Sequence, residues 1–476
     1  MSVYESYEMV VGLEVHAELK TKTKIFCACP TTFGAQPNTL CCPVCMGLPG
    51  TLPVLNERVV ELAIRAGLAT HCSIAPTSGH DRKNYFYPDM PKAYQITQYE
   101  HPLCKDGYLM IDTADGVKRV GITRIHIEED AGKLIHDRTQ GTLLDFNRCG
   151  VPLIEIVSSP DIRSAEEARA YLRKLRTLLL YTEVSDCRMN EGSLRCDVNL
   201  SVRRRGEKNF GVRTEIKNLN SIAFVGKAID YEFERQVDLL ERGESVRQET
   251  RRFDEGTGKT ILMRVKENAD DYRYFPEPDL PPVRTTDTQI ERIRASLPIL
   301  PDDRKALYTK AYALSDADAD QITADRAMAD YFEAAARQTE YPKILANLLL
   351  TELTRLSDGE SFACPIAPAH MAELATLSGN STVNSSTAKK LIAELWEHDQ
   401  SPSKLVTERG LAQINDTALL QTLVQEILAS NPKILADYRN GKKAAAKTVV
   451  GQIMGKTGGR ANPILLGELV EQELNT

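Results

Sequence analysis

A proline-rich segment at residues 276–282 divides this 476-residue chain into two parts with different residue patterns. Four of its seven residues are proline, which lacks an amide hydrogen and fixes φ, so the segment sustains neither a helix nor a central strand. Strands and helices mix before it, and the pattern after it is helical almost to the end. Length alone indicates about two to four domains. We predict domains at residues 1–282, 283–401 and 402–476, with the second break near Ser401 and Pro402.

Two segments of the first part alternate strictly between apolar and polar residues. They are residues 10–19, whose polar face carries Glu14 and His16, and residues 193–203. Alternation with a period of two residues is typical of a strand with one buried face. Shorter strand-like runs occupy residues 120–127, 142–146, 151–157 and 212–217.

Two helices are predicted in the same part. The first starts at Ser164, where Glu167 supplies the partner of a capping box, and runs to about Tyr181. The second spans about residues 221–242 and ends before Gly243, a residue typical of helix C-termini. Strands outnumber helices and do not alternate regularly with them. We therefore predict an α+β fold rather than a doubly wound one.

Composition restricts the classes of protein to consider. No apolar run approaches the roughly 20 residues that cross a bilayer, and the first eight residues resemble neither a signal nor a transit peptide. We expect a cytoplasmic protein without a membrane partner. The net charge of −7 gives no overall attraction to nucleic acid, so any RNA binding requires a local basic patch.

Acidic residues gather around one histidine in the strand-rich part. Glu14 and His16 share a strand face about 7 Å apart. Residues 128–130, Glu-Glu-Asp, follow an apolar run, and Glu155 lies between two isoleucines. A buried charge needs a partner or a metal, and carboxylates near an imidazole suit Mg²⁺ with nucleotide phosphates. The alternative is a solvated strand face.

Cysteines form a second pattern, in which Cys27 and Cys29 precede the sequence Cys42-Pro-Val-Cys45. Closely spaced pairs separated by a loop are typical of a structural Zn²⁺ site with four thiolate ligands. Cys41 is an alternative to Cys42, and buried thiols without a metal are the alternative to the whole site. Eleven cysteines in a large chain without a secretion signal favour reduced thiols or a metal over disulfides.

A local excess of positive charge lies near the end of the chain. Residues 433–460 hold seven lysines and arginines against one acid, Asp437. Lys442, Lys443 and Lys447 converge at a predicted helix start, an arrangement that suits the phosphates of folded RNA. The alternative is an ordinary solvated helix.

Eight motifs occur in order along essentially the whole chain. They are VGLEVH (residues 11–16), DRKNYFYPD (81–89), HIEEDAGK (126–133), PLIEIV (152–157), EGSLRCD (191–197), EIKNLN (215–220), ETRRF (249–253) and VGQIM (450–454). Together they resemble the family formed by the B subunits of aspartyl/glutamyl-tRNA amidotransferases. The resemblance implies a first domain shaped as a cradle, with a catalytic fold similar to glutamine synthetase and the guanido kinases. An all-α domain and a small all-α tail domain that contacts tRNA would follow.

The resemblance also implies a reaction. Members of this family are ligases that use ATP and Mg²⁺ to phosphorylate the side-chain carboxylate of Glu-tRNA(Gln) or Asp-tRNA(Asn). Ammonia then attacks and gives Gln-tRNA(Gln) or Asn-tRNA(Asn). A separate glutaminase, the A subunit, supplies the ammonia, and the heterotrimer is completed by a small C subunit. This chain has no serine–lysine amidase signature of its own.

Positions that match the family motifs give the expected site residues. The Mg²⁺ site would comprise Glu14, His16, Glu129 and Glu155, with Glu128 as the alternative to Glu129. The Zn²⁺ ligands would be Cys27, Cys29, Cys42 and Cys45, and the lysines of the ammonia passage would be Lys83 and Lys92. Candidates for phosphate or substrate contacts are Arg195, Asp197, Lys217 and Arg264, and those for tRNA are Lys442, Lys443 and Lys447.

Three other functions compete with this interpretation. A non-catalytic tRNA-binding scaffold would leave Glu14 and His16 as surface groups, and a zinc hydrolase would need an open metal position, which four cysteines do not provide. An aminoacyl-tRNA synthetase would carry nucleotide signatures that are missing here. The sequence leaves open which of the two misacylated tRNAs is the substrate.

Overall fold

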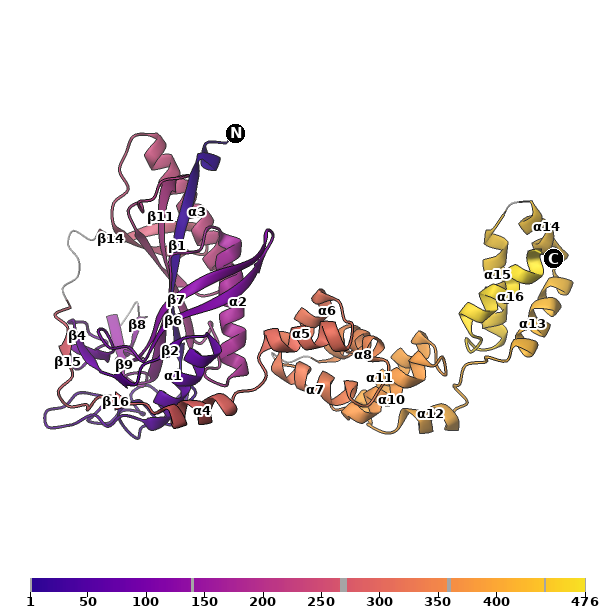
Figure 1. The fold of residues 1–476 in the computed structure, drawn as a ribbon, viewed down its shortest axis with the longest axis horizontal. Helices are drawn as coiled ribbons and strands as arrows, with labels where there is room; N and C mark the ends of the chain where they lie inside the picture. The colour runs from indigo at the N-terminus through magenta and orange to yellow at the C-terminus, as the bar shows by residue number, and fades with distance from the viewer. Residues whose placement is uncertain (1, 138–140, 266–271, 358–360, 441, 476) are drawn as a thin grey trace. The chain divides into compact units, whose positions relative to one another are not determined.

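The computed structural model describes residues 2–137, 141–265, 272–357, 361–440 and 442–475. The chain divides into two compact units, Met1–Leu300 and Pro301–Thr476 (Figure 1). The first unit contains the large sheet, and the described part of the second is helical. The mixed α/β composition that the sequence predicts is confirmed.

A nine-stranded sheet forms the centre of the first unit. Its order is β14-β13-β12-β11-β1-β10-β7-β6-β2, and every neighbouring pair is antiparallel except β12 and β13. The strands are β1 (Tyr7–Glu18), β2 (Ser73–Ile74), β6 (Cys104–Thr113), β7 (Gly116–Glu129), β10 (Pro152–Ser158), β11 (Leu194–Arg204), β12 (Thr214–Leu219), β13 (Glu249–Asp254) and β14 (Lys259–Val265).

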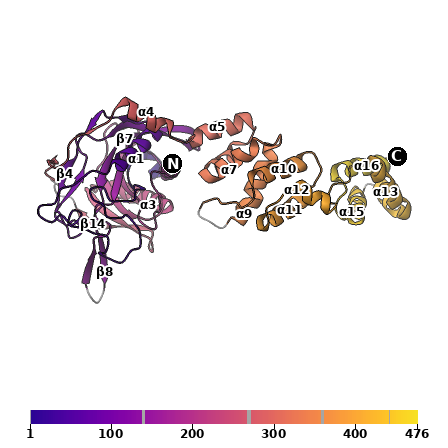
Figure 2. The same ribbon diagram turned by 90° about the horizontal axis from the view of Figure 1, so that it is seen from below.

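Three small sheets supplement the large one. β4 (Asp81–Asn84) pairs with β5 (Tyr94–Thr97) and β15 (Phe275–Pro276), and β3 (Thr77–Ser78) pairs with β16 (Val283–Arg284). β8 (Lys133–Asp137) and β9 (Gly141–Asp145) form a hairpin that projects from the unit in Figure 2. A short 3-10 helix, η1 (Val3–Ser6), precedes β1.

Helices cover one face of the large sheet, and the opposite face carries polar residues of β1. α1 (Glu57–Ala69), α2 (Ala165–Tyr181) and α3 (Ile222–Glu241) pack on this sheet, and α4 (Asp287–Ala295) packs on α1. Figure 1 shows α2 and α3 on one side of β1 and the short strands β4, β8 and β9 on the other. Val11, Leu13 and Val15 of β1 are buried in the core beneath the helices. Glu14 and His16 alternate with these residues and therefore lie on the opposite face of the sheet.

The predicted strands and helices are confirmed in the first unit. Residues 10–19 and 193–203 coincide with β1 and β11, and the shorter runs coincide with β7, β9, β10 and β12, with ends that extend beyond the strands by at most two residues. Ser164 caps α2, since its hydroxyl accepts from the amide of Glu167 at 3.1 Å. α3 ends just before Gly243, whose φ of +75° suits a glycine.

The second unit has two hydrophobic cores. One gathers residues between Tyr308 and Val406, and the other gathers residues between Leu420 and Leu474. The division into domains at residues 282 and 401 stays a prediction. The helical elements are α5 (Pro301–Ala311), α6 (Asp316–Thr323), α7 (Arg326–Ala336), α8 (Pro342–Leu348), the π-helical η2 (Leu349–Leu353), α9 (Thr354–Leu356), α10 (Pro368–Gly379), α11 (Ser385–Glu397), α12 (Pro402–Glu408), α13 (Thr417–Ser430), α14 (Pro432–Arg439), α15 (Ala444–Lys456) and α16 (Pro463–Asn475). Among the residues that the structure describes, no helix combines the length and apolar character needed to span a bilayer.

Candidate active site

Four neighbouring strands bring ionisable residues into one row. Arg195 of β11 lies opposite His16 of β1, His16 lies opposite Glu155 of β10, and Glu155 lies opposite His126 of β7. Adjacent strands are about 4.8 Å apart, so the whole row spans roughly 15 Å. Strand pairing therefore assembles a charged cluster from four distant parts of the sequence.

Carboxylates and imidazoles are in close contact within this row. Nε2 of His16 lies 3.4 Å from Oε1 of Glu128 and 3.5 Å from Oε2 of Glu155, and Nε2 of His126 lies 3.3 Å from the same Glu155 oxygen. One ligand atom from each of His16, Glu128 and Glu155 lies within 4.8 Å of the others. These three side chains could share one cation.

The cluster shifts the pKa values of its members. Burial by itself would lower the pKa of His16, but the carboxylates of Glu155 and Glu128 outweigh it and raise that pKa to about 9. Burial would raise the pKa of Glu155, yet His126 and His16 hold it well below its ordinary value. The carboxylates thus create a local potential that favours positive charge.

A second acidic group lies beside the first. Oxygen atoms of Glu14, Asp197 and Glu215 also lie within 4.8 Å of one another. Nζ of Lys217 is 2.7 Å from Asp197 and 2.9 Å from Glu215, and the amide of Asn199 donates to Glu14 at 2.9 Å. Burial and the neighbouring carboxylates, first among them Glu155, raise the pKa of Glu14. Lys217 offsets part of this negative charge.

Both groups line one polar cavity of about 280 Å³, to which Lys83 and Arg264 also contribute. A second cavity of about 350 Å³ shares His16, Lys83 and Glu128 with the first and adds Arg195, which is bonded to Asp130 at 2.6 Å. Burial opposes the charge on Lys83, but Glu128, Glu155 and two nearby tyrosines together outweigh it and raise the pKa of this lysine. The predicted residues Glu14, His16, Lys83, Glu155, Arg195, Asp197, Lys217 and Arg264 are therefore brought together.

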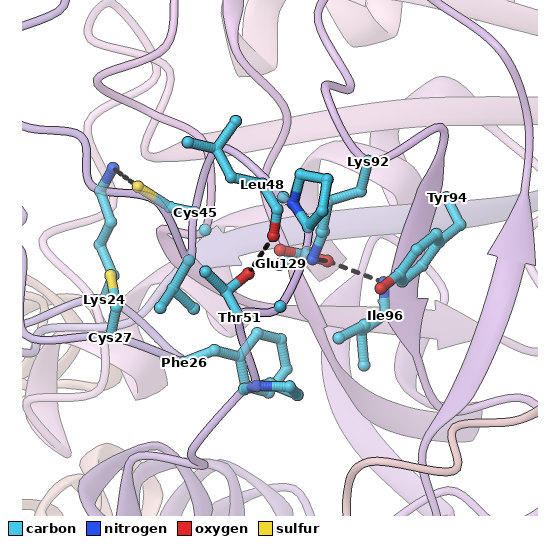
Figure 3. Close-up of a pocket in the computed structure, with 16 residues that line it drawn as sticks. Lys24, Phe26, Cys27, Cys45, Leu48, Thr51, Lys92, Tyr94, Ile96 and Glu129 are labelled. Carbon is cyan, nitrogen blue, oxygen red and sulfur yellow. Dashed lines mark hydrogen bonds and ion pairs between the residues drawn. The ribbon is translucent and has the colours of Figure 1, made fainter.

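Glu129 does not face this cluster, whereas Glu128, the alternative that the sequence left open, does. Which of the two glutamates binds a metal stays a prediction. Consecutive residues of a strand point to opposite faces, so Glu129 of β7 points away from His16. Its carboxylate accepts from the amide of Ile96 at 2.9 Å and forms an ion pair with Lys92. Figure 3 shows Glu129 and Lys92 in a different cavity of about 190 Å³, which Cys45 also lines.

The cysteines that we predicted as ligands converge beside this third cavity. The sulfur atoms of Cys27, Cys29, Cys42 and Cys45 lie within 4.8 Å of one another, and those of Cys42 and Cys45 are 4.0 Å apart. Cys41 donates instead to the carbonyl of Asn38 at 3.3 Å. The four converging cysteines could hold a metal ion.

The electrostatics of the cysteine cluster favour a thiolate. A hydrogen bond from Cys27 contributes most to lowering the pKa of Cys45 to about 4, and burial opposes this shift. The ammonium group of Lys24 also lowers this pKa and lies 3.6 Å from the sulfur. Figure 3 marks this contact with a dashed line. Thiolate is the form that binds metal.

Family comparisons agree with this geometry. Residues 9–291 match the family model of the GatB/GatE catalytic domain, and residues 330–474 match that of the GatB domain. The chain belongs to the GatB family. A relative from Caldicellulosiruptor saccharolyticus, named as the B subunit of aspartyl/glutamyl-tRNA(Asn/Gln) amidotransferase, is 54% identical over 475 residues, with 98% of this chain and 99% of the relative covered. Proteins of the same name from Carboxydothermus hydrogenoformans and Geobacter sulfurreducens are 52% and 51% identical with the same coverage. The resemblance inferred from the motifs is confirmed.

The predicted tRNA-binding lysines of this GatB protein lie in the second unit. Lys442, Lys443 and Lys447 are exposed where α15 begins. Lys442 is 3.1 Å from Asp437, which neutralises part of its charge. The structure thus leaves these side chains accessible to a ligand.

Sequence reasoning missed His126, Asn199 and Glu215 in this GatB site. A signal existed for His126, because it alternates with the apolar residues of β7 and shares a strand face with Glu128. Asn199 and Glu215 are opposite each other on β11 and β12. That pairing is a long-range contact, which no pattern in the sequence encodes.

The position of His16 predicts an unusual titration. In metal-free protein, the imidazole of His16 should titrate near pH 9, and Glu155→Gln should lower this pKa by about one unit or more because the main attractive charge is removed. NMR of histidine-labelled chain, with eight histidines to assign, measures both values. Glu100→Gln, at an exposed position, is the control.

Protonation of His16 also affects the free energy of unfolding, because its pKa differs between the folded and unfolded chain. A folded-state pKa above the ordinary 6.5 means that protonated His16 stabilises the folded chain below pH 6.5, and that this contribution disappears as pH rises through about 9. The free energy of unfolding should therefore fall over this range, and fall less in Glu155→Gln. A wild-type His16 that titrates near pH 6.5 would contradict the described electrostatics.

Proposed function

We propose that this chain activates the side-chain carboxylate of Glu-tRNA(Gln) or Asp-tRNA(Asn) by transfer of the γ-phosphoryl group of ATP. The observation that carries the proposal is the cluster of His16, Glu128 and Glu155 in a cavity that also contains lysine and arginine side chains. The names of the relatives, which specify an amidotransferase of aspartyl- and glutamyl-tRNA, support the substrate class.

The donor atoms of the cluster fit Mg²⁺. Two carboxylates and an imidazole lie within reach of one ion, and the raised pKa of His16 reports a potential that attracts cations. Glu128 and Glu155 would hold the ion with His16, and Glu14, Asp197 and Glu215 form a second group of the same kind. Bound Mg²⁺ would neutralise the charge of the phosphates and help to align them.

Activation makes chemical sense for this substrate. A carboxylate is a poor electrophile, whereas the acyl phosphate formed on the substrate with release of ADP has a good leaving group. Ammonia then forms the amide bond, and inorganic phosphate leaves. The residues of the chain mainly position the reactants. Lys83 and Lys217 line the cavity that would hold phosphates, and Arg195 extends it toward the carboxylate substrate.

A cradle domain similar to glutamine synthetase and the guanido kinases would suit this chemistry, and we assign it to residues 1–282. Helical domains over residues 283–401 and 402–476 complete the proposed organisation. The reduced thiols and a tRNA substrate fit the cytoplasm, where we place the protein.

Ammonia would arrive from a separate glutaminase, the A subunit, in a heterotrimer that also contains a small C subunit. The designation of the relatives as B subunits supports an assembly of several different chains. Lys92 and Glu129 in the third cavity and Lys83 in the polar cavities are the residues that we assign to the passage.

Zinc is the metal that best fits the four cysteines. Sulfur atoms bound to Zn²⁺ at about 2.3 Å lie roughly 3.8 Å apart in a tetrahedron, close to the 4.0 Å between Cys42 and Cys45. Four thiolate ligands leave no open position, so we assign the ion a structural role. It would fix the loop that lines the third cavity.

Phosphoryl transfer predicts a specific loss in a reconstituted complex. With ammonium salt, ATP and Mg²⁺, wild-type chain should convert Glu-tRNA(Gln) or Asp-tRNA(Asn) with equal release of ADP. Glu155→Gln should lower the rate by about 100-fold or more, since it removes a carboxylate that would hold the Mg²⁺ ion, and this ion neutralises the charge of the phosphates. Glu100→Gln is the matched control. An assembled Glu155→Gln complex with wild-type activity would disprove the proposed site.

The two neighbouring glutamates of β7 provide a test of which one binds the ion. Affinity for Mn²⁺, measured by electron paramagnetic resonance on the purified chain, should fall at least about tenfold in Glu128→Gln and stay unchanged in Glu129→Gln. A loss of Mn²⁺ affinity in Glu129→Gln with unchanged affinity in Glu128→Gln would instead identify Glu129 as the ligand.

Metal analysis tests the zinc site. Purified wild-type chain and Cys41→Ser should each contain about one zinc per chain, whereas Cys42→Ser should contain less than about 0.3, because three sulfurs bind the ion poorly. The two variants remove adjacent thiols, of which only Cys42 belongs to the cluster. Equal zinc in all three proteins would overturn the assignment of Cys42.

The exposed lysines at the start of α15 should bind tRNA phosphates. Replacing Lys442, Lys443 and Lys447 together with alanine should weaken tRNA binding and reduce the slope of log K against log salt by about two to three, since each phosphate contact contributes roughly 0.7–0.9. Filter binding at several salt concentrations measures both. Replacing the exposed Lys310, Lys390 and Lys404 is the control, and equal effects of the two triple variants would contradict a specific surface.

A further inference from the structure

The ammonium group of Lys24 lies inside the protein, since the residue is 0% exposed. Lysine is almost never fully buried unless its charge is paired. Within the described ranges, its nitrogen contacts the carbonyl oxygen of Leu40 at 2.8 Å and the sulfur of Cys45 at 3.6 Å, and no carboxylate forms an ion pair with it. The positive charge therefore faces a cysteine sulfur instead of an acid, and Figure 3 shows the nitrogen directed at this sulfur.

Lys24 contacts both pairs of the cysteine cluster. Its backbone amide donates to the carbonyl oxygen of Cys29 at 2.9 Å, and its side chain reaches Cys45 of the second pair. The Leu40 carbonyl that it also binds lies two residues before Cys42. One residue thus joins the two segments that supply the four sulfur atoms.

The backbone around Lys24 is held in place. The amide of Ile25 donates to the carbonyl of Gly150 at 2.9 Å, and the carbonyl of Ile25 accepts from the backbone amide of Asn56 at 2.8 Å. A Cβ atom on Gly150 would lie 3.7 Å from Cδ of Lys24 and 3.6 Å from Cβ of Cys45, so Gly150 lies against both side chains. The fold itself therefore fixes the ammonium group beside the sulfur.

A cluster that holds zinc needs a positive charge near it. Four thiolates bound to one Zn²⁺ leave two uncompensated negative charges. Cys45 is buried and the other three cysteines are partly buried, and a buried charge is costly unless it is paired. The backbone amide of Cys42 donates to the sulfur of Cys45 at 3.1 Å, but it contributes only a dipole. Lys24 adds a full positive charge at the same sulfur.

We propose that Lys24 is a positioning residue of the zinc site. Its charge would offset one of the two negative charges of the loaded cluster, and its contacts with Leu40 and Cys45 would hold the second pair of cysteines in place for the metal. Groups that contact metal ligands in this way typically contribute a factor of about 10 to 100 to the affinity for the metal. The inference rests on the proposed zinc site and does not depend on phosphoryl transfer.

The zinc affinity of the full-length chain tests the charge of Lys24. After removal of metal with EDTA and dialysis, Zn²⁺ is titrated in competition with a chromophoric chelator. Lys24→Met keeps a side chain of similar length without the charge and should raise the Kd of Zn²⁺ at least about tenfold, and Lys24→Gln should do the same. Lys24→Arg keeps a permanent positive charge and should stay within about threefold of wild type.

Lys92 provides a matched control in the same cavity. Its ammonium group forms an ion pair with Glu129, and the residue lines the third cavity together with Lys24. Lys92→Met should leave the Kd of Zn²⁺ unchanged, because the charge that it removes is paired with a carboxylate. An equal loss of zinc affinity in Lys92→Met and Lys24→Met would overturn a specific role of Lys24.

Melting temperatures separate an effect of charge from a loss of packing. Zinc that binds only the folded chain raises the melting temperature by an amount that falls as the Kd rises. At one fixed concentration of free zinc, the difference from the melting temperature in EDTA should therefore be smaller in Lys24→Met than in wild type. If the substitution only disrupts packing, both temperatures should fall equally and the difference should stay as in wild type, which would overturn the inference.

The outcomes also separate this inference from the zinc site on which it rests. If wild type and Lys24→Met bind Zn²⁺ equally, the zinc site stands and the role of Lys24 is wrong. If Lys24→Arg binds as weakly as Lys24→Met, charge is not the cause and the inference is also wrong. If the wild-type chain binds no zinc, the proposed site fails and the inference fails with it.

Discussion

The antiparallel register of β11, β1, β10 and β7 is the constraint on which the rest of this site depends. It sets Arg195, His16, Glu155 and His126 side by side although they come from segments far apart in the sequence. A slip of one residue in any pair would turn these side chains into the core and bring apolar residues to the surface. The apolar face of β1, packed beneath the helices, therefore fixes the chemistry of the opposite face.

Charge compensation explains how so many acids lie together in a folded chain. Glu128 and Glu155 are balanced by two imidazoles, Asp197 and Glu215 by Lys217, and Asp130 by Arg195. Each pairing is local, and the partners come from neighbouring strands. When a cation and a polyanion bind together in such a site, the cation can replace the protein cations that contact the carboxylates. The polyanion can then contact the protein cations that are released, so the side chains need to move little.

Sequence patterns predicted what depends on local periodicity. The alternation in β1 and β11 and the capping box of α2 were sufficient to place these elements, and the motifs identified the family. The two adjacent glutamates of β7 show the limit of this approach. The HIEEDAGK motif contains both Glu128 and Glu129, and only the register of β7 against β10 decides which of them faces His16.

The two adjacent glutamates of β7 also bear on how this chain can vary in evolution. A substitution near the end of β7 changes one side of the sheet and leaves the other intact. A deletion or insertion of one residue before Glu128 would exchange the two carboxylates between separate cavities and damage both at once. The hairpin of β8 and β9 begins only a few residues later and projects from the unit, and projecting surface segments generally tolerate changes in length. Related chains should thus conserve the length of β7 more strictly than many of its residues, and tolerate gaps in the hairpin.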